Sequence, residues 1–195
     1  MSDYQVLSLS GIIDRTKDRK LLEQRLGEFL CSRDKQLENF IHSKALVYES
    51  KGFSRTYLVI DFSGEPQYGF QPIAAFFTLA ITATDYDHVS RSKKEKVLGA
   101  KPGRNTFKAF PGILIAQMAR DDRYASDFIS GAALLQECEH YIDLGRQYVG
   151  GRNIYLDCRE SLVSTYQRGG YRLLVDKPTE EGYYKMYKVL PDKQF

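Results

Sequence analysis

GILIAQMARDDRYASDFISGAALLQEC (Gly112–Cys138) predicts a strand, a short polar loop and a helix in direct succession. Ser130 is a suitable N-cap for that helix, and Gly131 allows a ligand to approach the main chain. A helix that starts just after a strand presents free backbone N–H groups and the positive end of its dipole at one place. The stretch therefore predicts an anion-binding site; an ordinary capped helix is the alternative.

The segments after this stretch continue the alternation of strands and helices. RNIYLDCRE (Arg152–Glu160) predicts a strand, and ESLVSTYQRGG predicts a short helix ended by glycine. YRLLV and YYKMYKVL predict two closing strands around a DKPTEEG turn. The order strand, helix, strand, helix, strand favours parallel pairing in the middle of the sheet.

The segments before it predict helices and a β-hairpin. Arg19–Gly52 is rich in helix by pattern, because apolar residues between Leu37 and Ala45 recur on one helical face. SRTYLVIDF (Ser54–Phe62) and PIAAFFTLAITAT (Pro72–Thr84) predict two strands that pair as a hairpin across a turn-forming segment. We therefore expect an α+β (α/β) fold in which helices flank a mixed β-sheet.

Length and composition indicate one compact, soluble domain. The chain has 195 residues, of which 43% are hydrophobic, and this is enough for one core. No apolar run approaches the roughly 18 residues of a membrane span, and a charge cluster interrupts the apolar start, so we expect a cytoplasmic protein without a signal peptide. The three cysteines are sparse and odd in number, which disfavours a disulfide scaffold. No ligand spacing for zinc occurs, and no metal is expected.

A basic block occupies the middle of the chain. His88–Lys108 holds seven Lys or Arg and one acid, Glu95, although the formal net charge of the chain is only +3. The block lacks clean periodicity, so the sequence predicts a loop insertion at about residues 85–111. Such a cationic loop suits the phosphate backbone of a nucleic acid. A solvated loop without a partner is the alternative.

Tyr166 ends a predicted helix one turn before two glycines. A phenol has a reference pKa of about 10, is protonated at neutral pH and is able to donate a proton to a leaving group. The chain contains 14 tyrosines, so a tyrosine of the core or its rim is the alternative. Cys158 also lies in this region, but no histidine is near it in sequence to activate a thiolate.

Taken together, FPGILIAQMARDDRY…SGAALLQEC and YLDCRESLVSTYQRGGYRLL resemble the GNAT superfamily of N-acetyltransferases. In that family a strand–loop–helix binds the pyrophosphate of acetyl-coenzyme A, and a later helix ends in a tyrosine before a basic residue, glycine and an aromatic, as in YQRGGY. Phe29, Cys31, Leu37 and SRTYLVID are similar to the branch that includes the tRNA-acetylating toxins of toxin–antitoxin pairs. The resemblance covers Phe29–Tyr171, interrupted by the basic block, and implies a single N-acetyltransferase domain over residues 1–195 with a splayed sheet.

The resemblance implies roles for individual residues. The main chain of Met118, Ala119 and Arg120 would hold the pantetheine arm, and the N–H near Arg120 would stabilise an oxyanion. Tyr166 would protonate the departing thiolate after direct attack by a neutral amine. The pyrophosphate would be bound by the loop and the first helical turn, which comprise Ser126, Phe128, Ile129, Ser130, Gly131 and Ala132.

The pyrophosphate loop departs from the family pattern. The family has Gln or Arg, two residues, Gly, one residue, and then Gly or Ala; aligned on GAALL, these positions hold Ser126, Ile129 and Gly131 here. Only the last position is kept. Ile129 therefore has to donate its N–H from a backbone conformation that does not require glycine.

The sequence leaves the acceptor open. The function we expect is N-acetylation of a primary amine with acetyl-coenzyme A as the donor. One alternative is acetylation of aminoacyl-tRNA, with the basic block on the tRNA backbone; another is a catalytically silent acyl-coenzyme A-binding module. A homodimer is also expected, by analogy, from aromatic strands such as YYKMYKVL.

Overall fold

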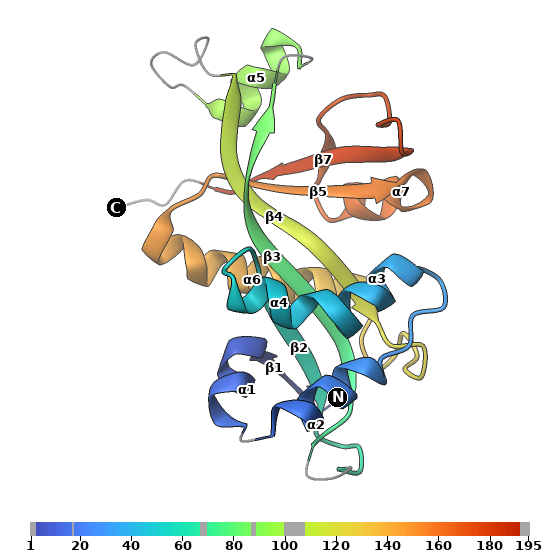
Figure 1. The fold of residues 1–195 in the computed structure, drawn as a ribbon. Helices are drawn as coiled ribbons and strands as arrows, with labels where there is room; N and C mark the ends of the chain where they lie inside the picture. Colours follow the sequence, from blue (N-terminus) through green and yellow to red (C-terminus); the bar gives the residue numbers. More distant parts are fainter. Residues whose placement is uncertain (1–2, 17, 67–69, 87–88, 100–107, 192–195) are drawn as a thin grey trace. The chain divides into compact units, whose positions relative to one another are not determined.

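The structure is a computed structural model that describes residues 3–16, 18–66, 70–86, 89–99 and 108–191 (Figure 1). Its seven strands are hydrogen-bonded in the order β1-β2-β3-β4-β5-β7-β6. The chain forms two compact units: unit 1 comprises Met1–Ala80 and Ala116–Asp143, and unit 2 comprises Ile81–Ile115 and Leu144–Phe195. Strands β3 and β4 and helix α6 contribute residues to both units, and each unit is described below by itself.

Unit 1 contains the N-terminal strands and most of the helices. Its strands are β1 (Tyr4–Ser8), β2 (Arg55–Asp61), the first part of β3 (Ile73–Asp85) and the last part of β4 (Ala109–Arg120). Its helices are α1 (Leu9–Arg15), α2 (Arg19–Gly27), α3 (Lys35–Asn39), the π-helix η1 (Phe40–Lys44), α4 (Ala45–Ser50) and most of α6 (Gly131–Val149).

Strands β2 and β3 pair antiparallel, which confirms the predicted hairpin. Strand β1 also pairs antiparallel with β2, from Tyr4 opposite Asp61 to Ser8 opposite Tyr57. Strand β1 and helix α1 were not predicted from the sequence. Both are short, and the alternation of polar and apolar residues between Tyr4 and Ser8 is too brief to stand out without its partner strand.

Short polar side chains start the helices. The Ser8 hydroxyl accepts from the Gly11 N–H (3.1 Å), and the Asp18 carboxylate accepts from the Leu21 N–H (3.0 Å). Asp34 caps α3 in the same way. Because each cap satisfies an N–H that has no intrahelical partner, these residues fix where the helices begin.

The core of unit 1 lies between its helices and the sheet. Leu22 and Leu26 of α2, Phe29 and Ile41 pack with Phe76 of β3, and all five are almost completely buried. The rings of Phe29 and Phe76 meet edge-on with centroids 5.2 Å apart. Burial of this much apolar surface accounts for the helix-rich pattern of residues 19–52, which the sequence predicted.

Unit 2 holds the C-terminal strands. Its own elements are α5 (Arg91–Leu98), β5 (Asn153–Arg159), α7 (Glu160–Arg168), β6 (Arg172–Leu173) and β7 (Tyr183–Val189). Strands β4 and β5 pair in parallel, with Ile113 opposite Ile154 and Leu114 opposite Tyr155, as predicted for the middle of the sheet. Strand β7 pairs antiparallel with both β5 and β6.

Part of the basic block is a helix and not the predicted loop. Arg91–Leu98 forms α5, and the Ser90 hydroxyl caps it by accepting from the Lys93 N–H (3.4 Å). Val97 and Leu98 are buried in the unit 2 core with Tyr155 and Tyr187. The block's one apolar pair therefore anchors the helix. Residues 87–88 and 100–107 of the predicted insertion lie outside the described residues.

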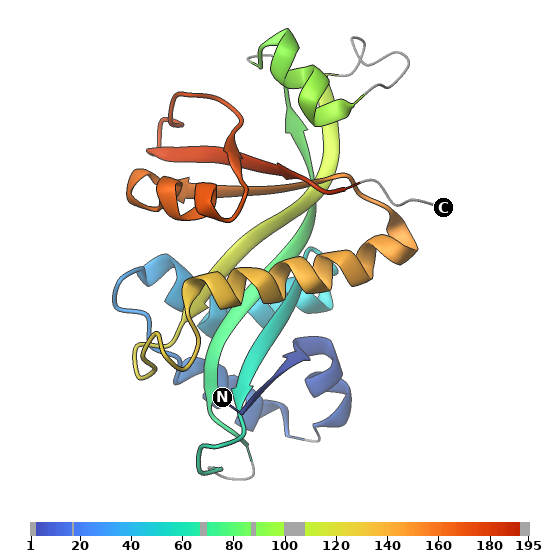
Figure 2. The ribbon, with the colours of Figure 1, turned by 180° about the vertical axis from the view of Figure 1, so that it is seen from behind.

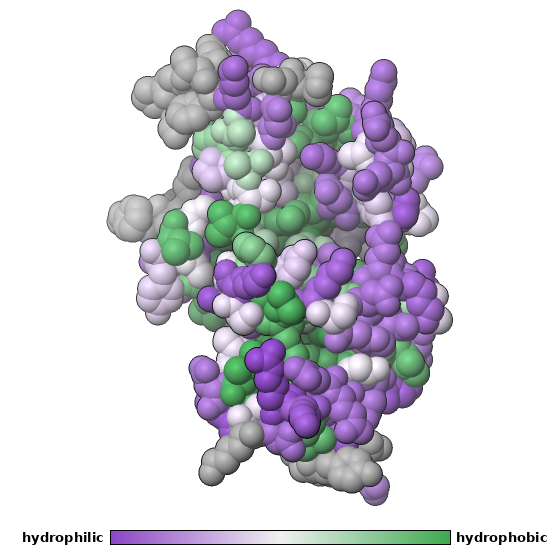
Figure 3. All heavy atoms as spheres, in the orientation of Figure 1, coloured by the Kyte–Doolittle hydropathy of each residue, from purple (hydrophilic) through white to green (hydrophobic). Residues whose placement is uncertain are grey.

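The outer side of α5 is hydrophilic. Arg91, Ser92 and Lys96 are exposed, and hydrophilic side chains cover this helix at the top of Figure 3. Among the described residues, no helix combines the length and the apolarity that crossing a membrane requires.

Candidate active site

Strand β4 ends at a buried carboxylate that organises the following loop. Asp121 is completely buried, and its carboxylate accepts from the backbone N–H groups of Leu30 (2.9 Å) and Arg123 (2.9 Å). It also accepts from the Arg123 guanidinium at Nε (2.8 Å) and Nη2 (2.7 Å). The loop therefore leaves β4 in a fixed direction.

Arg120 connects the end of β4 to the end of the loop. Its Nη1 donates to the carbonyl oxygen of Ile129 (2.9 Å). The Ile129 side chain is 2% exposed, so the residue at which the sequence resemblance expected a glycine is held by apolar packing and by the guanidinium that its carbonyl contacts. The Nε of Arg120 is buried and has no hydrogen-bond partner among the described residues.

The first turn of α6 leaves donors free, as the sequence predicted. The Ser130 hydroxyl accepts from the Ala133 N–H (3.1 Å), and the Ser130 carbonyl accepts from the Leu134 N–H (2.9 Å). The N–H groups of Gly131 and Ala132 have no acceptor among the described residues, and both residues are exposed. A methyl group built on Gly131 would meet no atom within 4 Å.

Three contacts within unit 1 hold α6 in place. The Tyr141 hydroxyl donates to the Val6 carbonyl (2.9 Å), and its ring lies 4.3 Å from that of Tyr57. The Cys138 thiol lies 3.9 Å from the sulfur of Met118 on β4. The start of the helix is therefore fixed relative to β4.

These residues fit a phosphorylated ligand. The segment from Arg120 to Ala132 combines several features that suit an anion. It has a helix N-terminus with two exposed residues whose N–H groups are free, and there is open space over Gly131. It also carries the guanidinium of Arg120, whose Nε has no hydrogen-bond partner among the described residues. Of the other predicted binding residues, Met118 is half-buried and Ala119 buried on β4. Ser126 is exposed, and the half-buried Phe128 packs against Tyr124 (4.8 Å between ring centroids).

Tyr166 lies in the last turn of α7 in unit 2. It is half-buried, and its ring meets the Tyr171 ring nearly edge-on at 5.9 Å. The Tyr166 carbonyl accepts from the Tyr171 N–H (3.1 Å). Lys188 of β7 donates from Nζ to the Gly169 carbonyl (3.0 Å), so the turn after Tyr166 is tied to the sheet. Tyr166 belongs to unit 2, and the segment from Arg120 to Ala132 belongs to unit 1.

Cys158 is not placed as a nucleophile. Its thiol is 3% exposed, and burial, assisted by the negative charge of Asp157, raises its pKa to about 11. Cys31 and Cys138 are also buried, and burial raises the pKa of each thiol. Because a thiolate is the reactive form, burial disfavours all three cysteines as nucleophiles.

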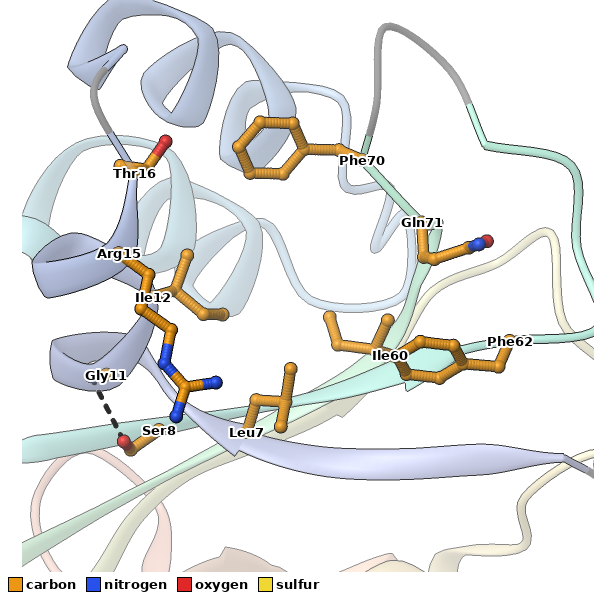
Figure 4. A pocket seen from close by; sticks show the side chains of 10 residues that line it. All are labelled: Leu7, Ser8, Gly11, Ile12, Arg15, Thr16, Ile60, Phe62, Phe70 and Gln71. Atoms are coloured by element: carbon orange, nitrogen blue, oxygen red, sulfur yellow. Dashed lines mark hydrogen bonds between the residues drawn. The ribbon is translucent and has the colours of Figure 1, made fainter.

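Each unit also has a hollow of its own. In unit 2 a hollow of about 310 Å³ is lined by Lys96 of α5, Gly170, Arg172, Tyr187 and Val189. In unit 1 a hollow of about 400 Å³ lies beside α1 (Figure 4). Its lining is largely apolar and includes Leu7, Ile12, Ile60 and Phe70, with Arg15 the one charged side chain among the residues around it.

The fold is shared with solved bacterial toxins. The AtaTR complex bound with AcCoA has a TM-score of 0.68 and 18% identity, covering 97% of this chain and 95% of that one. AtaT complexed with acetyl-methionyl-tRNAfMet has a TM-score of 0.64 and 16% identity, covering 94% of each chain. A tyrosine-to-phenylalanine mutant of KacT has a TM-score of 0.69 and 12% identity, covering 95% of this chain and 94% of that one.

No family model matches the sequence, and a search of curated proteins also finds no match. The likeness is therefore one of structure, and it extends over almost the whole chain. The chain has the fold of the AtaT and KacT toxins, which confirms the fold expected from its resemblance to the toxin branch of the GNAT superfamily.

Proposed function

We propose that this protein is an N-acetyltransferase that moves an acetyl group from acetyl-coenzyme A to a primary amine. The observation that carries the proposal is the free first turn of α6 beside Arg120, in a fold whose relative AtaTR has been solved with AcCoA. The loop and the helix offer N–H groups and positive charge to a pyrophosphate group, and acetyl-coenzyme A contains such a group.

The donor would lie along the end of β4 and the start of α6. The main chain of Met118, Ala119 and Arg120 binds the pantetheine arm, and the segment from Ser126 to Ala132 binds the pyrophosphate. The N–H groups of Gly131 and Ala132, two exposed residues in the first turn of α6, would be the principal donors. The bond from Arg120 to the Ile129 carbonyl would hold the loop in shape without a glycine at residue 129.

Tyr166 would act as the general acid. A neutral amine attacks the thioester carbonyl, the carbon–sulfur bond breaks, and the phenol gives its proton to the sulfur that leaves. The nitrogen loses one proton to solvent as the amide forms, the product amide keeps the acetyl group, and coenzyme A leaves as the thiol. The tyrosinate regains a proton from solvent before the next cycle.

An aminoacyl-tRNA is the acceptor that the charges of unit 2 favour. Lys96 and Arg172 line one hollow, and Lys188 lies nearby on β7. AtaT, a structural relative, has been solved with acetyl-methionyl-tRNAfMet. An amine carried by a polyanion would use this cationic surface, whereas a small neutral amine would not.

Tyr166→Phe tests the proposed function. We expect release of free coenzyme A, measured with a panel of amines and charged tRNA, to fall about 100-fold or more in kcat. Thermal stabilisation by acetyl-coenzyme A should not change. Tyr148→Phe is the matched control, because Tyr148 is 88% exposed and lies far along α6 from its first turn. Donor binding without turnover on any acceptor would instead identify a silent binding module.

Charge reversal in the unit 2 hollow tests the acceptor. Lys96→Glu combined with Arg172→Glu should raise KM for charged tRNA and leave acetyl-coenzyme A binding unchanged. Lys93 is unsuitable because its Nζ forms an ion pair with Asp176 (2.9 Å). Lys20→Glu, an exposed change on α2, serves as control. Unchanged tRNA kinetics would remove this surface from the proposal and leave a smaller amine as acceptor.

A homodimer stays a prediction. Exposed apolar side chains such as Tyr148 and Val149 at the end of α6 are consistent with an interface. Light scattering over a range of protein concentrations would measure the mass directly.

A further inference from the structure

The three C-terminal strands carry a single acidic side chain, that of Asp157. Strands β5, β6 and β7 carry four cationic residues, Arg159, Arg172, Lys185 and Lys188, and one acid, Asp157. Asp157 is exposed near the end of β5. Its carboxylate forms no ion pair and no hydrogen bond within the described part of the chain.

Strand geometry places Asp157 on one face of β5. Side chains alternate between the faces of a strand, so Asp157 shares its face with Tyr155 and Arg159. The antiparallel register puts Lys185 of β7 directly opposite it. Tyr155 and Tyr187, two residues back on the two strands, form the core with α5 on this same face.

Helix α7 packs on the other face. Lys188 pairs with Ile154, which shares its face with Leu156 and Cys158, and Lys188 also holds the Gly169 carbonyl at the end of α7 (3.0 Å). The two views of the ribbon show α7 on one side of β5 and β7 (Figures 1 and 2). Tyr166, in the last turn of α7, and Asp157 therefore approach β5 from opposite faces.

The surroundings of Asp157 suit a group that exchanges a proton. Although the side chain is accessible to solvent, the protein packed around its strand desolvates the carboxylate and raises its pKa, and Lys185 opposes this only in part. A desolvated carboxylate gains more from a bound cation than an ordinary surface carboxylate does. Its other charged neighbour on this face, Arg159, is engaged with the Glu181 carbonyl (2.9 Å) and with the Tyr183 ring.

We infer that Asp157 binds the ammonium group of the acceptor and removes its proton before acetyl transfer. The inference rests on the proposed function. The carboxylate takes one proton from R–NH₃⁺, and the neutral amine attacks the thioester carbonyl. Tyr166, from the opposite face, protonates the leaving sulfur. The nitrogen loses its second proton to solvent as the amide forms, and Asp157 and Tyr166 exchange protons with solvent before the next cycle. An acid with cations beside it also fits an acceptor that is an amine on a polyanion, because Lys185 and Arg172 of the same face receive phosphates and Asp157 receives the ammonium.

Asp157→Asn tests the inference. We expect kcat/KM for the acceptor, with charged tRNA and with the best amine of the panel, to fall about 100-fold at neutral pH. The acidic limb of the pH profile should flatten, and Asp157→Glu should recover part of the rate. The dissociation constant of acetyl-coenzyme A, measured by calorimetry, should stay unchanged. Glu180→Gln, a change at an exposed acid of the same unit, is the matched control.

The outcomes separate the two proposals. An active wild type with an equally active Asp157→Asn variant, or with an unchanged pH profile, would overturn the role of Asp157 and leave the proposed function standing. A wild type that is inactive on every acceptor would overturn both. Loss of donor binding in a folded Asp157→Asn variant would also overturn the inference, because it would place the carboxylate on the donor.

Discussion

The guanidinium of Arg120 and the carbonyl oxygen of Ile129 are 2.9 Å apart, and this bond joins the last residue of β4 to the residue before the α6 N-cap. The bond turns the Ile129 carbonyl toward the strand. It also places a permanent positive charge on the carbonyl of the residue before the α6 N-cap. A loop with isoleucine at a family glycine position thus obtains its shape from a side chain of the neighbouring strand.

Replacement of this arginine should weaken donor binding. Arg120→Met keeps most of the aliphatic stem but removes the charge and the bond to Ile129. Because the loop would lose the bond that fixes its shape and a positive charge near a proposed pyrophosphate site, we expect the affinity for acetyl-coenzyme A to fall about tenfold or more by calorimetry. Arg19→Met, at a side chain that is 73% exposed, is the control. Equal affinities in the two variants would contradict the assignment.

Substitutions at two glycines of α6 should have different effects, one on the stability of the protein and the other on its affinity for the acetyl donor. A methyl group meets nothing within 4 Å at either Gly131 or Gly145. Gly145→Ala, within the helix, should raise stability by about 0.5–1 kcal/mol and leave donor affinity unchanged. Gly131→Phe should leave the fold intact, because the space over this residue is open, but it should lower donor affinity, since the ring would cover the first turn of α6. Chemical denaturation and calorimetry on both variants measure these effects, and tight donor binding by Gly131→Phe would count against the site.

The carboxylate at the end of β4 should support stability. Asp121 accepts from two backbone N–H groups and twice from Arg123, and it is completely buried. Asp121→Asn places an amide NH₂ against donors, so we expect urea unfolding to show a loss of roughly 1–3 kcal/mol. Asp14→Asn, at an exposed position of α1, should change little. A loss no larger than that of the control would show that the network is not needed.

The helices and strands were predicted correctly from the sequence where a long apolar segment is bounded by a clear capping residue or turn. Ser130, which was expected as an N-cap, bonds the Ala133 N–H, and the strands around residues 55–61 and 73–85 are as predicted. Helix α5 was missed because only Val97 and Leu98 make its apolar side, and their burial against Tyr155 is a long-range contact. Asp157 was missed for a related reason. Its isolation among cations appears only when the register aligns β5 with β7.

The thiols should resist modification in the native protein. Burial raises the pKa of Cys158 to about 11, and the other two thiols are also buried. We expect a disulfide reagent at neutral pH to label none of them quickly without denaturant and all three in urea. Cys158→Ala should retain acetyl transfer. Rapid native labelling of Cys158, or loss of turnover in this variant, would reopen a covalent mechanism.

The ionised carboxylate of Asp157 should lower the stability of the folded protein at neutral pH. Since desolvation raises its folded pKa above the unfolded value, its carboxylate opposes folding once the pH exceeds both values. Asp157→Asn should therefore raise Tm modestly at pH 7, and the gain should vanish below about pH 4, where the unfolded carboxyl is also protonated. Thermal unfolding of both proteins across this range is the measurement, and a lower Tm for the variant at pH 7 would contradict the shift.

Through the bond from Lys188 to the Gly169 carbonyl, the last strand helps to position Tyr166, the proposed general acid. Strand β7 lies between β5 and β6, and it holds the turn that follows Tyr166. A chain cut before residue 183 would keep every residue proposed to bind the donor and Tyr166 itself, but it would lose the bond that ties the turn after Tyr166 to the sheet. Under the proposed function, such a truncation should therefore lower turnover more than donor binding.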